Sequence, residues 1–267
     1  MVNQFKSSLR FYCQLLKTSF KQAIAVKSAF CLRVIFMIIN NLMMLFAWGA
    51  LFHQFNTING WSFYDFMFMT GLCVGSFSIW SLFFRGMGIY MARMIEYGDL
   101  DTYLTQPRTA LFHISCSISD PSGLGDFITG LLLMTASGLL TWQTAPIVLT
   151  CFICATICFL SVNILVSSLP FFFRKTDDLS ERLFYLFFNI AGYPGSIYNG
   201  LAKLLLCTLF PVGIISVFPV LLLQTFSIWI LIYIVLFSVG FLSISIFFFQ
   251  RGLRRYEGGN RFGIHGQ

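Results

Sequence analysis

The side chains that could support metal or redox chemistry in this 267-residue chain are eight cysteines and three histidines. Cys151, Cys154 and Cys158 are spaced to share one face of a helix. No histidine or carboxylate accompanies them, and a free cysteine in an apolar segment packs as a small hydrophobic side chain. None of the histidines has a partner in sequence; they are His53, His113 and His265. The sequence therefore predicts neither a metal site nor a catalytic residue.

Nucleotide chemistry is not indicated either. A phosphate-binding loop follows the pattern G-x-x-x-x-G-K-[ST], whose backbone N–H groups and lysine hold the phosphates. The nearest glycine cluster, Gly86-Met-Gly88, has no lysine after it, and no G-x-S-x-G turn for a serine nucleophile occurs. We expect the chain to be no enzyme and to bind no cofactor itself.

The longest polar stretch, residues 85–126, contains a short acidic segment. The sequence predicts a helix that Gly98 interrupts, after which the Asp99 carboxylate caps a second helix and Asp101 favours its positive first turn. Pro107 is expected to end this second helix. Its apolar edge consists of Leu100, Leu104 and Leu111. Two interpretations stay open from these residues alone: a docking surface for a partner, or an ordinary capped loop helix.

The elements that must position these residues are long apolar stretches. The chain is 57% hydrophobic and 10% charged and has 33 phenylalanines, more apolar surface than a soluble domain can bury. A membrane crossing needs about 20 apolar residues to span about 30 Å of hydrocarbon. We predict an all-α, polytopic membrane protein that forms one domain over residues 1–267. The six predicted spans are 34–52, 63–84, 127–145, 147–171, 183–198 and 226–249.

Basic residues are distributed unevenly between the two sides of this topology. Of the 17 lysines and arginines, 16 lie on one side of this topology. They precede the first span, lie in the loop between spans two and three or in the loop between spans four and five, or belong to the tail, residues 250–267. Only Lys203 lies on the other side. Because short cytoplasmic loops retain basic residues, both termini are expected in the cytoplasm. The net charge of +7 is then expected to serve orientation and attraction to membrane lipid, with no nucleic-acid partner.

Two further segments flank the spans. Residues 1–33 place apolar side chains at three- and four-residue steps beside a basic stripe, which predicts an interfacial amphipathic helix; the alternative is a solvated tail. The apolar stretch 199–222 contains Pro211 and Pro219, which disfavour one straight helix. We predict a re-entrant hairpin on the outer face, with a kinked seventh span as the second possibility.

Within the spans, small and polar residues indicate helix packing. Gly71 and Gly75, four residues apart, allow a close helix contact, either within the chain or between chains. The asparagines of the spans need partners away from lipid; they are Asn40, Asn41, Asn163 and Asn189. The mid-membrane carboxylates or histidines typical of ion relays are missing, which argues against an ion gradient as the energy source.

Residues 95–107, Ile-Glu-Tyr-Gly-Asp-Leu-Asp-Thr-Tyr-Leu-Thr-Gln-Pro, resemble the cytoplasmic-loop signature of type-2 ABC transporter permeases. The chain is most similar to a bacterial subfamily of uncharacterised export permeases. Three more motifs support the resemblance: Gly125-Asp-Phe127; Tyr193-Pro194-x-x-Ile-Tyr198 with Pro211 and Pro219; and Gly252-Leu-Arg-Arg-Tyr256-Glu257. The chain departs from the family at Gln250-Arg251, where a longer aliphatic residue is usual before the glycine.

This resemblance implies a bacterial inner-membrane permease that pairs with itself or a sister permease and with two copies of a separate cytosolic ATPase, which binds ATP and Mg. It implies the interfacial helix, six spans, a coupling segment over residues 89–107, and a re-entrant region with Tyr193, Pro194, Pro211 and Pro219. The implied coupling residues are Glu96, Gly98, Asp99, Leu100, Asp101, Leu104, Pro107 and Arg108.

The resulting hypothesis is an ATP-driven exporter permease, with a pathway between the first, second and fifth spans of two permeases. Aromatic walls would suit an amphipathic or lipid-like cargo, although lipid-facing phenylalanine explains the same composition. The alternatives are a non-transporting membrane scaffold or assembly factor and, third, an intramembrane enzyme.

Overall fold

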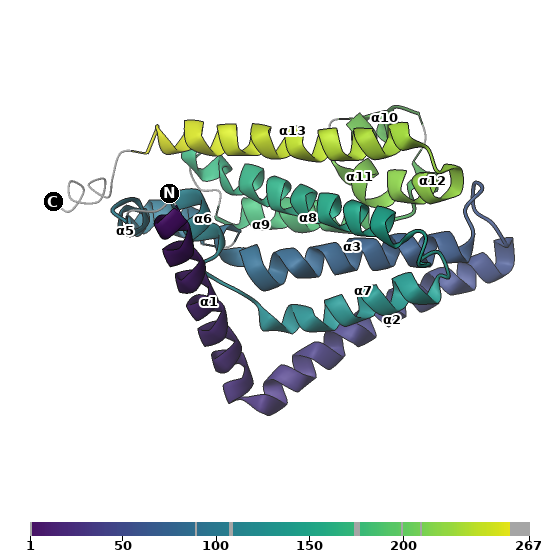
Figure 1. Ribbon diagram of the computed structural model, residues 1–267, viewed down its shortest axis with the longest axis horizontal. Helices are drawn as coiled ribbons and strands as arrows, with labels where there is room; N and C mark the ends of the chain where they lie inside the picture. The colour runs from purple at the N-terminus through teal and green to yellow at the C-terminus, as the bar shows by residue number, and fades with distance from the viewer. Residues whose placement is uncertain are drawn as a thin grey trace.

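The computed structural model describes residues 2–88, 90–106, 109–173, 177–198, 200–208 and 210–256. These residues form helices and turns, and the part of the chain so described contains no strand (Figure 1). The longer helices are α1 (Val2–Ala25), α2 (Lys27–Phe55), α3 (Phe63–Phe84), α7 (Leu124–Ala136), α8 (Ala145–Ser167), α9 (Asp177–Ala191) and α13 (Ile228–Leu253). The shorter α-helices are α4 (Met91–Tyr97), α5 (Leu100–Leu104), α6 (Ala110–Ser115), α10 (Gly200–Thr208), α11 (Val212–Ser216) and α12 (Phe218–Thr225). Single 3₁₀ turns are η1 (Arg85–Met87), η2 (Pro121–Gly123), η3 (Leu169–Phe171) and η4 (Gly195–Ile197).

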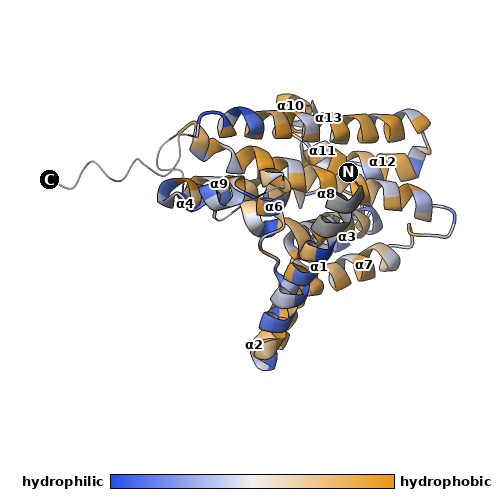
Figure 2. Ribbon diagram, turned by 60° about the vertical axis from the view of Figure 1, so that its left-hand side comes forward, coloured by the Kyte–Doolittle hydropathy of each residue, from blue (hydrophilic) through white to orange (hydrophobic). Residues whose placement is uncertain are grey.

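Helix α3 is the buried centre of the bundle. Helices α7 and α8 pack against it, α13 packs against α8, and α2 packs against α7. The outer helices expose apolar side chains, so the exterior of the bundle is hydrophobic in Figure 2. An apolar exterior of this extent suits hydrocarbon rather than water. The fold is that of an all-α, multi-pass membrane protein, as the sequence predicts.

Among the residues that the structure describes, four helical segments are long and apolar enough to cross a membrane: 27–55, 63–97, 145–171 and 228–253. Two other predicted spans are shorter in the structure. Helix α7 has 13 residues and α9 has 15, which correspond to about 20 Å and about 22 Å of length. The span predicted at 127–145 ends at Ala136 because Gly138 adopts a left-handed conformation (φ +72°) and turns the chain. The span predicted at 183–198 ends before Pro194.

The N-terminal region differs from its predicted boundary. The expected interfacial helix, residues 1–33, is divided at Val26, where φ is −109° and ψ is 78°. Helix α1 ends at Ala25, and α2 continues from Lys27 as one helix of 29 residues. Figure 1 shows the two helices meeting at an angle at this break. The Tyr12 hydroxyl donates a hydrogen bond of 2.9 Å to the Phe83 carbonyl oxygen, which fixes α1 to the end of α3.

The proline-containing stretch, predicted as a re-entrant hairpin, forms three short helices, α10, α11 and α12. Pro211 immediately precedes α11, and Pro219 lies in the first turn of α12, where no backbone N–H is required. All three helices lie at the end of the bundle opposite to α4–α6 (Figure 1). The Gln224 amide donates to the Asp65 carboxylate over 3.2 Å, which connects α12 to the start of α3.

Candidate functional site

The acidic segment 95–106 lies on two short helices separated by a left-handed glycine. Gly98 has φ +79° and ends α4, as the sequence predicts, because a side chain would be strained in this conformation. The predicted cap is wrong: the Asp99 carboxylate makes no capping hydrogen bond. The turn is closed by the backbone instead, since the Asp101 N–H donates to the Gly98 carbonyl and the Thr102 N–H to the Asp99 carbonyl, both over 3.1 Å.

An apolar cluster holds this segment against the bundle. We call it the methionine-rich cluster; its buried members are Met87, Met91, Met94, Leu100, Ile114, Ile164 and Phe249. The Leu100 side chain has 0% exposure, so it anchors α5 to the ends of α8 and α13 and is closed to a partner. Leu104, which the sequence places on the same apolar edge, is 40% exposed. Within the predicted leucine edge, Leu100 is therefore a buried anchor, whereas Leu104 is accessible to a partner.

The accessible face of α4 and α5 is polar. Arg93, Glu96 and Asp99 are exposed, and Tyr97 has 73% exposure. Asp101 is half-buried. Of the implied coupling residues, Pro107 and Arg108 lie outside the described part of the chain. The face that remains for a partner contains two carboxylates, on Glu96 and Asp99.

A polar junction that the sequence did not reveal lies beside this segment. The Arg85 guanidinium pairs with the Asp120 carboxylate, and its second terminal nitrogen lies 3.5 Å from the Tyr185 hydroxyl. The Asp120 N–H also donates to the Ser81 carbonyl over 3.1 Å. These contacts connect η1, directly after α3, and the middle of α9 with the segment before η2. Arg85 and Asp120 are 35 residues apart, so no local pattern could have identified the pair.

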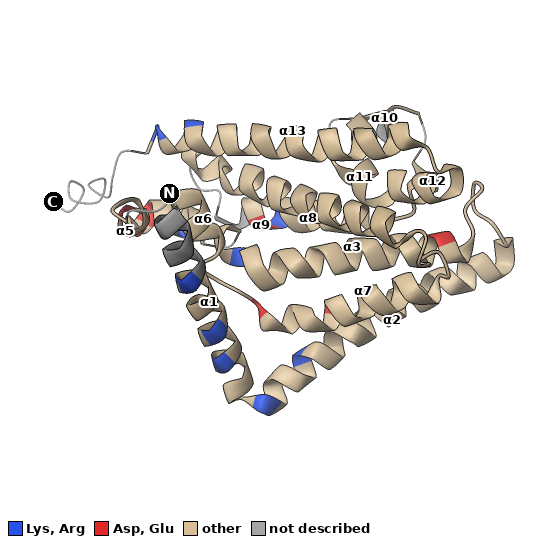
Figure 3. Cartoon of the chain, viewed as in Figure 1, with Lys and Arg blue, Asp and Glu red and all other residues tan. Residues whose placement is uncertain are grey.

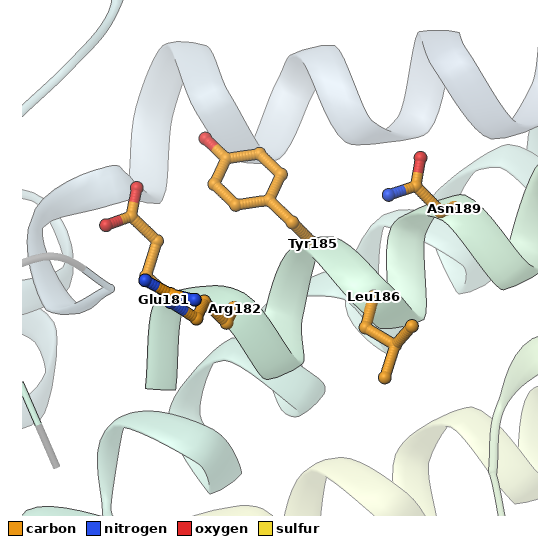
Figure 4. A pocket seen from close by; sticks show the side chains of 5 residues that line it. All are labelled: Glu181, Arg182, Tyr185, Leu186 and Asn189. Carbon is orange, nitrogen blue, oxygen red and sulfur yellow. The ribbon is translucent and has the colours of Figure 1, made fainter. Parts of the chain in front are cut away.

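Next to this junction, α9 lines an open pocket of about 540 Å³. Its lining residues are Glu181, Arg182, Tyr185, Leu186 and Asn189. Figure 4 shows Tyr185 and Asn189 reaching to one side of α9 and Leu186 to the other. The pocket thus combines charges of both signs, a phenol, an amide and an apolar side chain. Of these residues, only Asn189 was singled out from sequence.

Two glycines of α3 contact α7 at backbone distance. A Cβ on Gly71 would lie 2.7 Å from the Gly130 carbonyl oxygen and 2.8 Å from the Met134 backbone nitrogen. A Cβ on Gly130 would in turn lie 2.7 Å from Gly75 Cα. The helix that occupies the Gly71–Gly75 face thus comes from the same chain. Gly130 completes the contact. The sequence did not reveal its role, because a single glycine in a span forms no small-residue motif of the kind that Gly71 and Gly75 form.

A buried polar pair fastens α2 to α7. The Asn41 amide donates to the Asp126 carboxylate over 2.7 Å, and both side chains are buried. Next to this pair, a Cβ on Gly125 would lie 2.7 Å from the Val34 carbonyl oxygen. Asn41 therefore has the partner that its position in a span requires, whereas Asn40 is exposed. The sequence identified Asn41 and Asp126 separately, but their separation of 85 positions hid the pair.

Replacing Asn41 by leucine is expected to lower the free energy of unfolding by about 1 kcal/mol, because Asp126 then stays buried without its donor. Thermal unfolding of the purified protein in detergent measures this loss. Asn40→Leu is the matched control, since it makes the same change one residue away on the exposed face. Equal melting temperatures for the two variants would contradict a stabilising role for the pair.

The residues considered first for metal chemistry occupy packing positions. Cys151, Cys154 and Cys158 are buried in α8, and the Cys158 sulfur lies 3.5 Å from the Ser238 hydroxyl of α13. His113 is buried with its ring 4.9 Å from the Tyr103 ring. Among the residues that the structure describes, no group of three or more histidine, cysteine, aspartate or glutamate side chains could hold a metal ion. His265 lies outside them.

Comparison with protein families gives a match to the model of the ABC-2 family transporter protein over residues 38–259, more than half of the chain. Comparison with curated proteins and with solved structures gives no match. The matched range includes α3–α13, with the acidic segment, the methionine-rich cluster and the pocket on α9. This match supports the permease subunit of an ABC transporter, which the sequence motifs predict. The chain belongs to the ABC-2 transporter family.

Proposed function

We propose that this chain is the permease of an ATP-driven exporter, paired with itself or a sister permease and driven by two copies of a separate cytosolic ATPase. ATP and Mg would bind to that ATPase. The observation that carries the proposal is the acidic face of α4 and α5, with Glu96 and Asp99 exposed while Leu100 is anchored in the methionine-rich cluster. A force applied to this face would reach α8 and α13 directly, because the cluster contains residues of both helices.

In this proposal the chain crosses a bacterial inner membrane six times, with both termini in the cytoplasm. Figure 3 supports the orientation: basic side chains lie along α1, at the start of α2 and at the end of α13, whereas α10–α12 lie at the far end of the bundle. Helices α7 and α9 would be the short third and fifth spans. Helices α10–α12 would form the re-entrant region, since each is too short to cross hydrocarbon alone.

The transport pathway would run between α2, α3 and α9 of two permeases. The pocket on α9 supports this location because both polar side chains and Leu186 line it, and a cargo with a polar head and an apolar chain would match both. The Arg85–Asp120 pair would border the cytoplasmic mouth of the pathway through its contact with Tyr185. ATP binding would then move α4 and α5 and switch the pathway between inward and outward states.

Purification of the tagged permease with its native neighbours in mild detergent tests the proposal. We expect an ATPase subunit in near-equal amount and ATP hydrolysis by the purified complex. Recovery of this chain alone under several gentle conditions would contradict it.

The second candidate function, a membrane scaffold, is favoured by the extensive backbone contact between α3 and α7, which suits a rigid body. A scaffold would show no nucleotide-dependent change of conformation. Hydrogen exchange of the complex with and without ATP distinguishes the two functions.

A further inference from the structure

Three polar side chains are buried near the ends of α3 and α8, and each has an atom without a partner. The Trp80 side chain is 2% exposed, and Asn163 and Ser167 are each 1% exposed. Within the described part of the chain, no group forms a hydrogen bond with the Trp80 indole nitrogen, the Asn163 side-chain oxygen or the Ser167 hydroxyl. Lipid cannot supply such a partner, and burying a polar group without one is unfavourable. The three atoms therefore indicate a bound ligand.

Gly88, in the turn after η1, brings two of these side chains together. A Cβ at Gly88 would lie 3.0 Å from the Asn163 amide nitrogen and 3.9 Å from Cζ2 of Trp80, the ring carbon two bonds from the indole nitrogen. The Arg85 carbonyl oxygen also lies 3.9 Å from this point. Ser167 follows Asn163 by about one turn of α8 and shares its face of the helix. The three side chains thus border one small region beside a residue that has no side chain.

The chemistry of the three atoms limits what can bind there. The indole N–H of Trp80 only donates a hydrogen bond, so its partner must accept one. The Asn163 side-chain oxygen only accepts, so its partner must donate. A metal cation cannot accept from the indole, and an anion without a proton cannot donate to the amide oxygen. A water molecule does both, and buried waters typically form about three hydrogen bonds.

We propose that Trp80, Asn163 and Ser167 form a binding site for an internal water molecule between α3 and α8. The water accepts from the Trp80 indole, donates to the Asn163 oxygen and forms its third hydrogen bond with the Ser167 hydroxyl, which can donate or accept. Its place beside Gly88 is where the chain leaves α3 for the acidic segment. The inference goes beyond the proposed function and does not depend on it, because the site lies within the free permease.

Radiolytic footprinting of the purified permease in detergent tests for the water. An X-ray pulse converts a bound water into a hydroxyl radical, which oxidises the side chain beside it. Because bulk radicals do not reach a buried ring, Trp80 is expected to be oxidised about tenfold faster than Trp61, a tryptophan of similar burial. Equally slow oxidation of both would overturn the proposal and would favour a direct hydrogen bond from Trp80 to Asn163.

Two buried serines of α8 form a matched pair of variants. Ser167→Ala removes one partner of the water and is expected to slow oxidation of Trp80 about threefold, the effect of one lost hydrogen bond. Ser161→Ala removes a hydroxyl that already donates to the Ile157 carbonyl over 2.6 Å, so it should leave the rate unchanged. Equal rates in the two variants would refute the site.

Asn163→Leu removes the acceptor at similar size and should slow oxidation of Trp80 to the rate of Trp61. Fast oxidation in this variant would contradict the role of Asn163. If the variant does not fold, the serine pair still decides the question.

A larger reagent separates a bound water from bulk solvent that reaches the ring. N-bromosuccinimide is much larger than water and is expected to modify the exposed Trp142 but not Trp80. Modification of Trp80 as fast as that of Trp142 would show an open site and would overturn the proposal of an internal water.

Discussion

Reversing the two exposed carboxylates, Glu96→Lys with Asp99→Lys, is expected to weaken binding of the ATPase subunit by about 100-fold. Both side chains lie on the accessible face of α4 and α5, while the residues that hold these helices to the bundle lie on the other face. The reversal replaces attraction to a basic partner with repulsion, and like charges brought together at an interface are strongly unfavourable. Retention of the ATPase on the immobilised permease measures the effect.

Two control variants separate the role of this face from a general effect of charge. Glu96→Gln with Asp99→Asn removes the charges without reversing them and should give an intermediate loss. Thr18→Lys adds a positive charge at an exposed position of α1 and should leave binding unchanged. Binding to the wild type should also weaken as salt concentration rises, because exposed charges are screened. An ATPase that stays bound to the reversed variant would place its docking surface elsewhere.

Replacing Gly130 by alanine is expected to lower the free energy of unfolding by about 3 kcal/mol, the upper part of the usual range for overpacking. The new Cβ would lie 2.7 Å from both Cα and N of Gly75, which are backbone atoms of a buried helix and cannot move independently. Helices α3 and α7 would have to separate, and their contact is the most extensive in the bundle. Thermal unfolding in detergent measures the loss.

The matched control for this prediction is Gly240→Ala. Gly240 also lies inside an apolar helix, α13, but no atom is found within 4 Å of the position where its Cβ would be. The control variant should melt with the wild type or slightly above it, since alanine is the better helix former. Equal stability of the two alanine variants would mean that α3 and α7 separate without penalty.

Local features of the fold were largely predictable. The sequence placed one span at 63–84, and α3 has the same bounds. Gly98 was expected to interrupt the acidic helix and does so. The left-handed conformation is open to glycine because it has no Cβ, and this property is local to the residue. Span ends that depend on turns, such as the end of α7 at Ala136, were predicted less well. An apolar loop and an apolar helix have the same hydropathy, so the sequence placed the end of the third span too far along the chain.

The sequence by itself determined the class of environment, the family motifs and the helix break at Gly98. These follow from the composition of contiguous segments, since transfer into lipid and turn formation are local processes. The tertiary structure decided which side chains face inward. Leu100 is an anchor rather than a docking residue, and Asn41 pairs with Asp126, 85 positions further along the chain. Between lipid-embedded helices, shape and the pairing of buried polar groups select the contacts, and both depend on residues distant in sequence.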